Sequence, residues 1–129
     1  MIALGTNDIR YRDLSICAMN ENDYINQIDK IIDIINNKKS KIILIAPWIS
    51  TDDDPISKLN HKDKKEMMKK YSLALAKYSK INNYNFIDPN EYLEASILKN
   101  KKKYLIDYIH PNSKEGIKLY CGSILKNEK

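Results

Sequence analysis

An aspartate and a histidine stand three residues apart near the end of the sequence, in Asp107-Tyr108-Ile109-His110. On a turn, a carboxylate at this spacing can accept a hydrogen bond from one imidazole nitrogen. That bond fixes the tautomer and leaves the other nitrogen free to act as a base. A histidine before a proline is often a plain turn residue, so it is Asp107 that makes a catalytic role for His110 the favoured interpretation.

A second polar motif, Gly5-Thr6-Asn7-Asp8, follows an apolar run at the start of the chain. An asparagine at the end of a buried strand can donate its amide N–H to a developing oxyanion. The alternative is that Asn7 and Asp8 only close a turn, because both residue types bond their own backbone well. Together with the later motif, Asn7 is expected to complete most of a serine-hydrolase site.

The nucleophile is the part of such a site that the sequence does not identify. Ser15 lies in the segment after Asn7, and Ser50 follows the clearest strand. Neither stands in a Gly-x-Ser-x-Gly elbow or another recognisable nucleophile setting. We therefore do not expect either serine to replace a missing nucleophile.

Other polar and aromatic residues have weaker interpretations. Trp48 directly follows an apolar strand, so it is expected either to line a substrate pocket or to pack under the next loop. His61 is expected to be exposed to solvent. The consecutive residues Asp52–Asp54, which precede Pro55 and lack calcium-loop spacing, are expected to form a solvated loop. No metal and no organic cofactor is expected.

Composition indicates one globular domain over residues 1–129, with 43% hydrophobic and 30% charged residues. The net charge of +5 comes largely from lysines near residues 61–80 and 99–129, which we interpret as solvated faces. No nucleic-acid-binding signature accompanies them, so no nucleic-acid partner is expected. No apolar run approaches the roughly 20 residues of a membrane span. Without a visible signal peptide, and with Cys17 and Cys121 at no metal-like spacing, a reducing cytoplasm is the expected location. Cys121 is expected to be packed.

Hydrophobic periodicity predicts alternating strands and helices. The expected strands are residues 1–4, 41–47 and 85–88, the expected helices are 23–36, 61–81 and one after Ser113, and 90–106 is a short helix followed by a basic loop. Residues 9–20 are expected to be a loop. This order predicts an α/β fold with a parallel sheet between two helical layers.

Helix signals add local detail to this prediction. Asn20 or Asn22 is expected to cap the first helix, and Ser113 the last. The last helix is expected to share one apolar face made of Ile117, Tyr120, Cys121, Ile124 and Leu125.

The two polar motifs, in this order and at this separation, resemble blocks of the SGNH (GDSL-like) hydrolase family. Gly5-Thr6-Asn7-Asp8 corresponds to its Gly-x-Asn-Asp block, and Asp107-Tyr108-Ile109-His110 to its Asp-x-x-His block. The resemblance implies a three-layer α/β/α, flavodoxin-like fold and a serine ester hydrolase that cleaves acyl esters or O-acetyl groups. It implies His110 as the general base, Asp107 as its orienter and Asn7 as an oxyanion-hole donor.

The sequence departs from this family at its N-terminal end. The family's Gly-Asp-Ser block and the following glycine block precede the Gly-x-Asn-Asp block, and neither is found here. We therefore expect the chain to be the C-terminal part of an SGNH domain that lacks the N-terminal strands. Its substrate would be a small-molecule or glycan acyl ester, and the exposed sheet edge would favour pairing with another copy. The alternative is a degenerate, non-catalytic hydrolase fold that binds a ligand or a protein.

Overall fold

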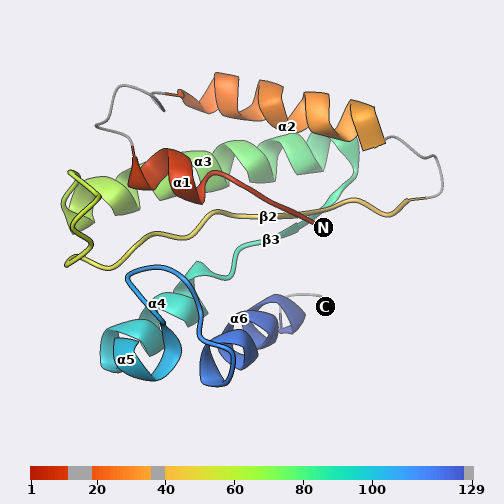
Figure 1. The fold of residues 1–129 in the computed structure, drawn as a ribbon. Coiled ribbons are helices and arrows are strands. Elements are labelled where there is room, and N and C mark those ends of the chain that lie inside the picture. Colours follow the sequence, from red (N-terminus) through yellow and green to blue (C-terminus); the bar gives the residue numbers. More distant parts are fainter. Residues whose placement is uncertain (12–18, 36–39, 127–129) are drawn as a thin grey trace.

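Three short parallel strands form the middle layer of the computed structural model, which describes residues 1–11, 19–35 and 40–126 (Figure 1). The strands are β1 (Ile2–Ala3), β2 (Ile43–Ile45) and β3 (Asn85–Ile87), in the order β1-β2-β3. Ile2 pairs with Leu44, and Leu44 pairs in turn with Phe86. All three predicted strands are present, each shorter than its apolar run.

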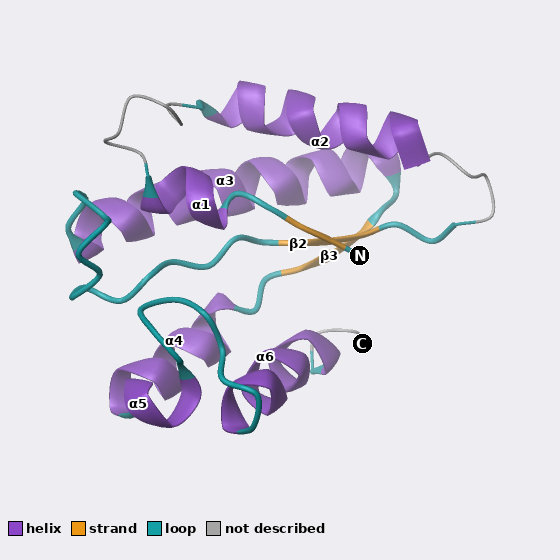
Figure 2. Cartoon of the chain, viewed as in Figure 1, coloured by secondary structure: helices purple, strands orange, loops and turns teal. Residues whose placement is uncertain are grey.

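Three helices cover one face of this sheet: α1 (Thr6–Arg10), α2 (Glu21–Ile35) and α3 (His61–Asn82) (Figure 2). Tyr24, Ile28 and Ile32 recur at four-residue steps and form the buried stripe of α2. Tyr71 and Leu75 form that of α3. The parallel rings of Tyr24 and Tyr71 stack with centroids 4.5 Å apart.

The opposite face carries α4 (Asn90–Lys99), α5 (Lys101–Tyr104) and α6 (Glu115–Leu125) (Figure 2). Side chains of β2 alternate between the two faces. Leu44 packs in the cluster with the α2 and α3 residues, whereas Ile43 and Ile45 pack with Ile87 and with Ile124 of α6. Since both faces are covered, β2 is apolar at every position, as a parallel central strand requires.

Two short helices, α1 and α5, were not predicted, because a helix of four or five residues gives only a weak signal in the sequence. Thr6–Arg10 forms α1 within the segment expected to begin a loop, and Lys101–Tyr104 forms α5 within the expected basic loop. The Asn100 side chain accepts a hydrogen bond from the Lys103 amide and starts α5. Residues 12–18 lie outside the described chain, so the prediction of a loop there has no outcome.

The cap predictions were half right. Asn20 caps α2 by accepting from the Asp23 amide at 2.9 Å. At α6, however, the capping side chain is Asn112 and not Ser113: Asn112 Oδ1 accepts from Lys114 and Gly116 amides at 3.1 and 2.9 Å. Asn112, one position before Ser113, can reach the unpaired backbone amides at the start of the helix as well as Ser113 could. The sequence alone does not show which of the two residues does so.

The predicted apolar face of α6 was wrong in part. Ile124 packs on the sheet and Tyr120 contacts Trp48, but Ile117, Cys121 and Leu125 are exposed. The buried residues of this helix include three small or aliphatic ones, Gly116, Leu119 and Ser123. The error arises because Gly116 and Ser123 turn toward the interior, and neither counts as apolar in a periodicity argument.

The outer edge of β1 has no neighbouring strand among the described residues. Met1 and Leu4, which flank this strand, are both exposed. In the described part of the chain, no helix is long and apolar enough to cross a membrane.

Candidate active site

The Asp107–His110 segment is a tight turn that its own aspartate closes. Asp107 Oδ1 accepts hydrogen bonds from the backbone amides of Ile109 and His110, each at 2.8 Å. The other carboxylate oxygen, Oδ2, lies 2.7 Å from Nδ1 of His110. The carboxylate therefore holds the backbone with one oxygen and the imidazole with the other. Nε2 of His110 is the ring nitrogen left for chemistry.

Contacts at the base of the turn fix it to the protein. Leu105 and Pro111 form an antiparallel bridge, and the Ile106 amide donates to the His110 carbonyl at 2.9 Å. Ile109 points inward and is buried, whereas the His110 side chain is 65% exposed. The turn is thus anchored by one apolar residue and presents its histidine to solvent.

Gly116 makes this anchoring possible through a close approach of two backbones. A Cβ at this position would lie 2.0 Å from the carbonyl oxygen of Tyr104 and 3.0 Å from the backbone of Pro111. Only glycine lets the first turn of α6 pack so closely against the two ends of the Asp107–His110 turn.

The charge of Asp107 is stabilised by the same contacts. Hydrogen bonds from the His110 amide and from its imidazole hold the pKa of the Asp107 carboxyl well below its usual range. Asp107 is therefore ionised wherever the histidine could act as a base.

Asn7 lies at the carboxyl end of β1, in the first turn of α1. Gly5 starts this helix with φ of +99°, a left-handed conformation that favours glycine. A Cβ on Gly5 would also lie 3.0 Å from the Tyr24 ring and 3.3 Å from Pro47. The Gly-x-Asn spacing thus has a local cause: the chain must turn sharply and pass close to the core before Asn7 is reached.

One cavity of about 430 Å³ brings the sequence motifs together. Asn7, Trp48 and His110 all line it, from three segments that are far apart in the sequence. Asp107 does not line the cavity but holds His110 from behind. Because β1 and β2 are parallel, their carboxyl ends lie at one edge of the sheet, where open α/β sheets bind ligands.

Trp48 lies between this cavity and a second one of about 600 Å³. Its ring meets that of Tyr120 edge-on, with centroids 5.2 Å apart, and its amide donates to the Thr6 hydroxyl at 3.3 Å. Of the two interpretations of Trp48, a pocket wall and a packed residue, the structure shows features of both.

Ser50, the candidate serine that the structure describes, does not line the cavity with His110. Ser50 is buried and lines the larger cavity, where its hydroxyl lies 3.5 Å from Nζ of Lys64. Ser15 lies outside the described residues. No serine is among the residues that line the smaller cavity in the described part of the chain.

His61 is less exposed than the sequence suggested. Its side chain is 33% exposed and its two nitrogens lie 2.8 Å from Asp52 and 3.3 Å from Glu94. Because α4 packs near the start of α3, a histidine expected in solvent instead lines the larger cavity.

The acidic loop also differs from the prediction, since Asp54 is buried at 4% exposure. Arg10 of α1 binds it with two hydrogen bonds, of 2.6 and 3.1 Å. Lys64 was expected on a solvated helix face and is fully buried, with Nζ bonded to the carbonyls of Ser50 and Thr51. Sequence reasoning missed this network because its partners lie up to 44 residues apart.

Across the described residues, no group of three or more His, Cys, Asp or Glu side chains is placed to hold a metal ion.

Comparisons with known proteins give similarity at the level of structure. No family model and no curated protein matches the chain. Solved structures of Axe2, an acetylxylan esterase from Geobacillus stearothermophilus, do match: one aligns with a TM-score of 0.67 at 19% identity and another with 0.69 at 17%. The alignment covers 98% of this chain and 57% of the Axe2 chain.

Three of the matching structures are catalytic mutants of Axe2. One replaces a serine, one an aspartate, and one the histidine three positions after that aspartate. At such low sequence identity the similarity shows the fold alone. It confirms the predicted α/β/α arrangement, because the parallel sheet and its flanking helices match part of the Axe2 fold, and this chain spans little more than half of the Axe2 structures.

Proposed function

We propose that this chain forms the acid–base half of an SGNH-type serine ester hydrolase, with the nucleophile supplied by a polypeptide segment outside these 129 residues. The observation that carries the proposal is the Asp107–His110 pair, with Oδ2 and Nδ1 2.7 Å apart, beside a cavity that Asn7 also lines. The catalytic aspartate and histidine of Axe2 have the same spacing as Asp107 and His110.

The proposed roles follow from the geometry. Nε2 of His110 takes the proton of the attacking serine and then gives it to the leaving alcohol, which produces an acyl-enzyme. In the second half, His110 takes a proton from a water molecule as the water oxygen attacks the acyl carbonyl. It then gives this proton to the serine oxygen as the ester bond breaks and the acid leaves. Asp107 keeps Nδ1 protonated and stabilises the imidazolium, and Asn7 donates to the oxyanion. These steps need no metal and no organic cofactor.

A separate source for the serine agrees with the lengths involved. In Axe2 the mutated serine and the mutated aspartate are separated by more residues than this whole chain contains. The open edge of β1 is the place where further strands would pair, from the completing segment or from a second copy of the chain.

The proposed substrate is an acyl ester of a small molecule or a glycan, with O-acetyl groups as the first class to test. Axe2 is described as an acetyl-xylooligosaccharide esterase. The aromatic rings of Trp48 and Tyr120 offer an apolar wall against which an acyl group or a sugar ring would pack.

The test uses the tagged chain, isolated from cells that naturally produce it together with any polypeptide that is continuous with it or bound to it. Hydrolysis of p-nitrophenyl acetate should fall by roughly 10³-fold or more in His110→Ala. It should fall by about 10²–10³-fold in Asn7→Ala. Glu115→Gln, which alters a half-buried residue of α6 and its exposed pair with Lys118, is the control. A near-normal rate in His110→Ala would rule the assignment out.

A second candidate is a non-catalytic binding module, and the absence of a serine around the described cavity favours it. It would bind an acetylated oligosaccharide through Trp48 without turnover. Calorimetry separates the two: a module binds the sugar equally well in wild type and His110→Ala, and its natural preparation shows no hydrolysis.

A further inference from the structure

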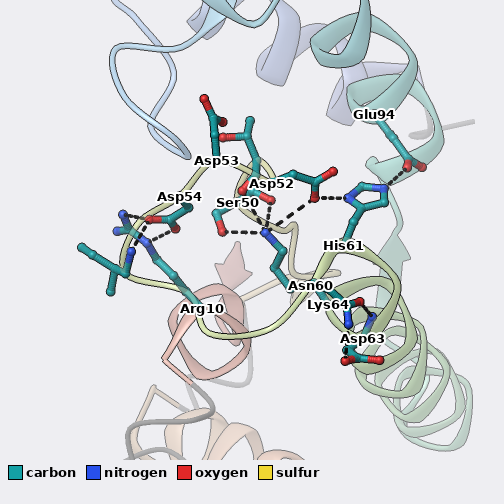
Figure 3. Close-up of polar contacts among 12 residues, drawn as sticks. Arg10, Ser50, Asp52, Asp53, Asp54, Asn60, His61, Asp63, Lys64 and Glu94 are labelled. Carbon is teal, nitrogen blue, oxygen red and sulfur yellow. Dashed lines mark hydrogen bonds and ion pairs between the residues drawn. The ribbon is translucent and has the colours of Figure 1, made fainter.

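The loop of residues 50–54 contacts both halves of the proposed site. Figure 3 shows its polar partners, which come from α1 on one side and α3 on the other. On the α1 side, Arg10 and Asp54 are 6% and 4% exposed and share two hydrogen bonds. Arg10 lies one helical turn after Asn7, so this pair fixes the helix that carries Asn7.

The same loop holds the catalytic turn through its backbone. The Thr51 amide donates to the carbonyl of Tyr108 at 2.8 Å, inside the Asp107–His110 turn. The guanidinium of Arg10 also interacts electrostatically with Asp107. The loop is therefore bonded to α1 at Asp54 and to the catalytic turn at Thr51.

Lys64 fixes the loop to the first turns of α3. Its ammonium donates to the carbonyls of Ser50 and Thr51 at 3.1 and 2.8 Å, and Figure 3 shows it directed into the loop. A fully buried ammonium is costly unless it is well bonded. Burial lowers the pKa of Lys64, while the carboxylates of Asp52 and Asp54 oppose this shift.

We propose that Arg10, Asp54 and Lys64 are positioning residues that clamp the 50–54 loop and so fix Asn7 relative to His110. This inference rests on the proposed function for its purpose, but the coupling itself is a property of the folded chain. A bidentate guanidinium–carboxylate pair sets orientation as well as distance, which a lysine point charge cannot do.

The test is NMR spectroscopy of the 129-residue chain, which requires no enzymatic activity. Arg10→Lys keeps the charge and removes the bidentate geometry. We expect the Asn7 signals and the Tyr108 and His110 signals to shift together in this variant. In Glu115→Gln, which breaks an exposed pair on α6, both sets of signals should stay in place.

A second variant keeps the test decisive if Arg10→Lys does not fold. Lys64→Met replaces a buried charge with an apolar side chain of similar length, a change that proteins often tolerate. It should produce the same joint shifts through loss of the bonds to Ser50 and Thr51. Movement of only one of the two sets of signals, or of neither, in a folded variant would overturn the coupling.

The catalytic consequence is measured separately in the natural preparation. Arg10→Lys should lower kcat by about tenfold with KM unchanged, because misplaced catalytic groups slow the chemical step. An unchanged kcat together with joint NMR shifts would remove the positioning role but leave the proposed hydrolase in place. Absence of hydrolysis in the wild type would instead contradict the proposed function.

Discussion

At the scale of single residues, the main feature of the site is that Asp107 binds the backbone and the imidazole of His110 at the same time. Oδ1 accepts two backbone amides and so closes the turn, and Oδ2 faces Nδ1 of His110. The oxygen that faces the ring cannot rotate away without breaking the turn. The tautomer of His110 is therefore fixed by local geometry before any substrate binds.

Asp107→Asn provides a direct test of this tautomer. The amide oxygen should keep the two backbone bonds, which places the NH₂ group against Nδ1 and forces the proton onto Nε2. In ¹⁵N-detected NMR of neutral His110, wild type should show the Nδ1–H form and the variant the Nε2–H form. The same tautomer in both proteins would mean that Asp107 does not control the ring.

The elements around the site are held by contacts that a search for motifs does not detect. Asn112 caps α6 with Oδ1, and its Nδ2 donates to the Lys103 carbonyl at 2.7 Å. Gly116 brings the same helix into contact with the backbone of Tyr104 and Pro111. Together, these two residues attach α6 to both ends of the Asp107–His110 turn.

Substitution of Asn112 should be costly and that of its neighbour should not. Asn112→Ala removes the cap and should lower the free energy of unfolding by about 1 kcal/mol or slightly more. Ser113→Ala should change it by less than about 0.5 kcal/mol, because this exposed side chain provides no cap. Urea titrations measure the free energy of unfolding of both variants. Equal losses in the two would mean that Asn112 is not the cap.

The two glycines of α6 should respond in opposite directions to the same change. Gly116→Ala places a methyl group against the Tyr104 carbonyl and should destabilise the fold by about 3 kcal/mol. Gly122→Ala meets no atom within 4 Å and should stabilise the helix by roughly 0.5–1 kcal/mol. Thermal unfolding of the two variants checks this, and a stable Gly116→Ala protein would contradict the close approach.

For the molecule as a whole, the fold was predictable wherever a long apolar pattern decides the structure. The β2 run and the four-residue repeat of α2 gave the sheet and the first crossover correctly. The Asp-x-x-His spacing predicted the 2.7 Å contact between Asp107 and His110, because a tight turn determines it locally. Asn7 and His110 are far apart in the sequence, and their membership of one site was inferred from the chemistry of the two motifs and from the resemblance to a known family.

What could not be predicted depends on contacts between distant residues. Nothing near Asp54 indicates that it is buried against Arg10, and nothing near Lys64 indicates that it enters a loop before its own helix. Such pairs leave no periodic signal, and an acidic or basic residue is exposed far more often than buried. The charged residues misassigned in this way, Asp54 and Lys64, lie beside the proposed site.

The buried Arg10–Asp54 pair makes the stability of the whole molecule depend on pH, and the sign of this dependence is definite. Burial alone would raise the pKa of Asp54, but hydrogen bonds from Arg10, Ser50 and the Ile56 amide lower it below its usual range. A carboxyl with a lowered folded pKa stabilises the protein above its unfolded pKa of about 3.9. That stabilisation is lost as the pH falls through the folded value.

Asp54→Asn should accordingly cost about 3 kcal/mol near neutral pH, where it leaves Arg10 without its charge partner. The difference from wild type should begin to shrink as the pH falls below about 4, since Asp54 of the unfolded wild-type chain then takes up a proton. The contribution of the charge is lost completely only below the lowered folded pKa, where the folded wild type also lacks the carboxylate. Urea unfolding at pH 7, 5 and 3 measures it. A gap that stays constant across this range would mean that the Asp54 charge adds nothing to stability.

The central claim is that His110 activates a serine carried outside this chain. The measurement that tests it most directly is fluorophosphonate labelling of the tagged protein from cells that naturally produce it, with the modified residue mapped by mass spectrometry. The proposed mechanism predicts one labelled serine, on polypeptide continuous with or bound to this chain. The label should be lost in His110→Ala and kept in Ser50→Ala. No serine label in that preparation, a label on Ser50, or a label indifferent to His110 would contradict it.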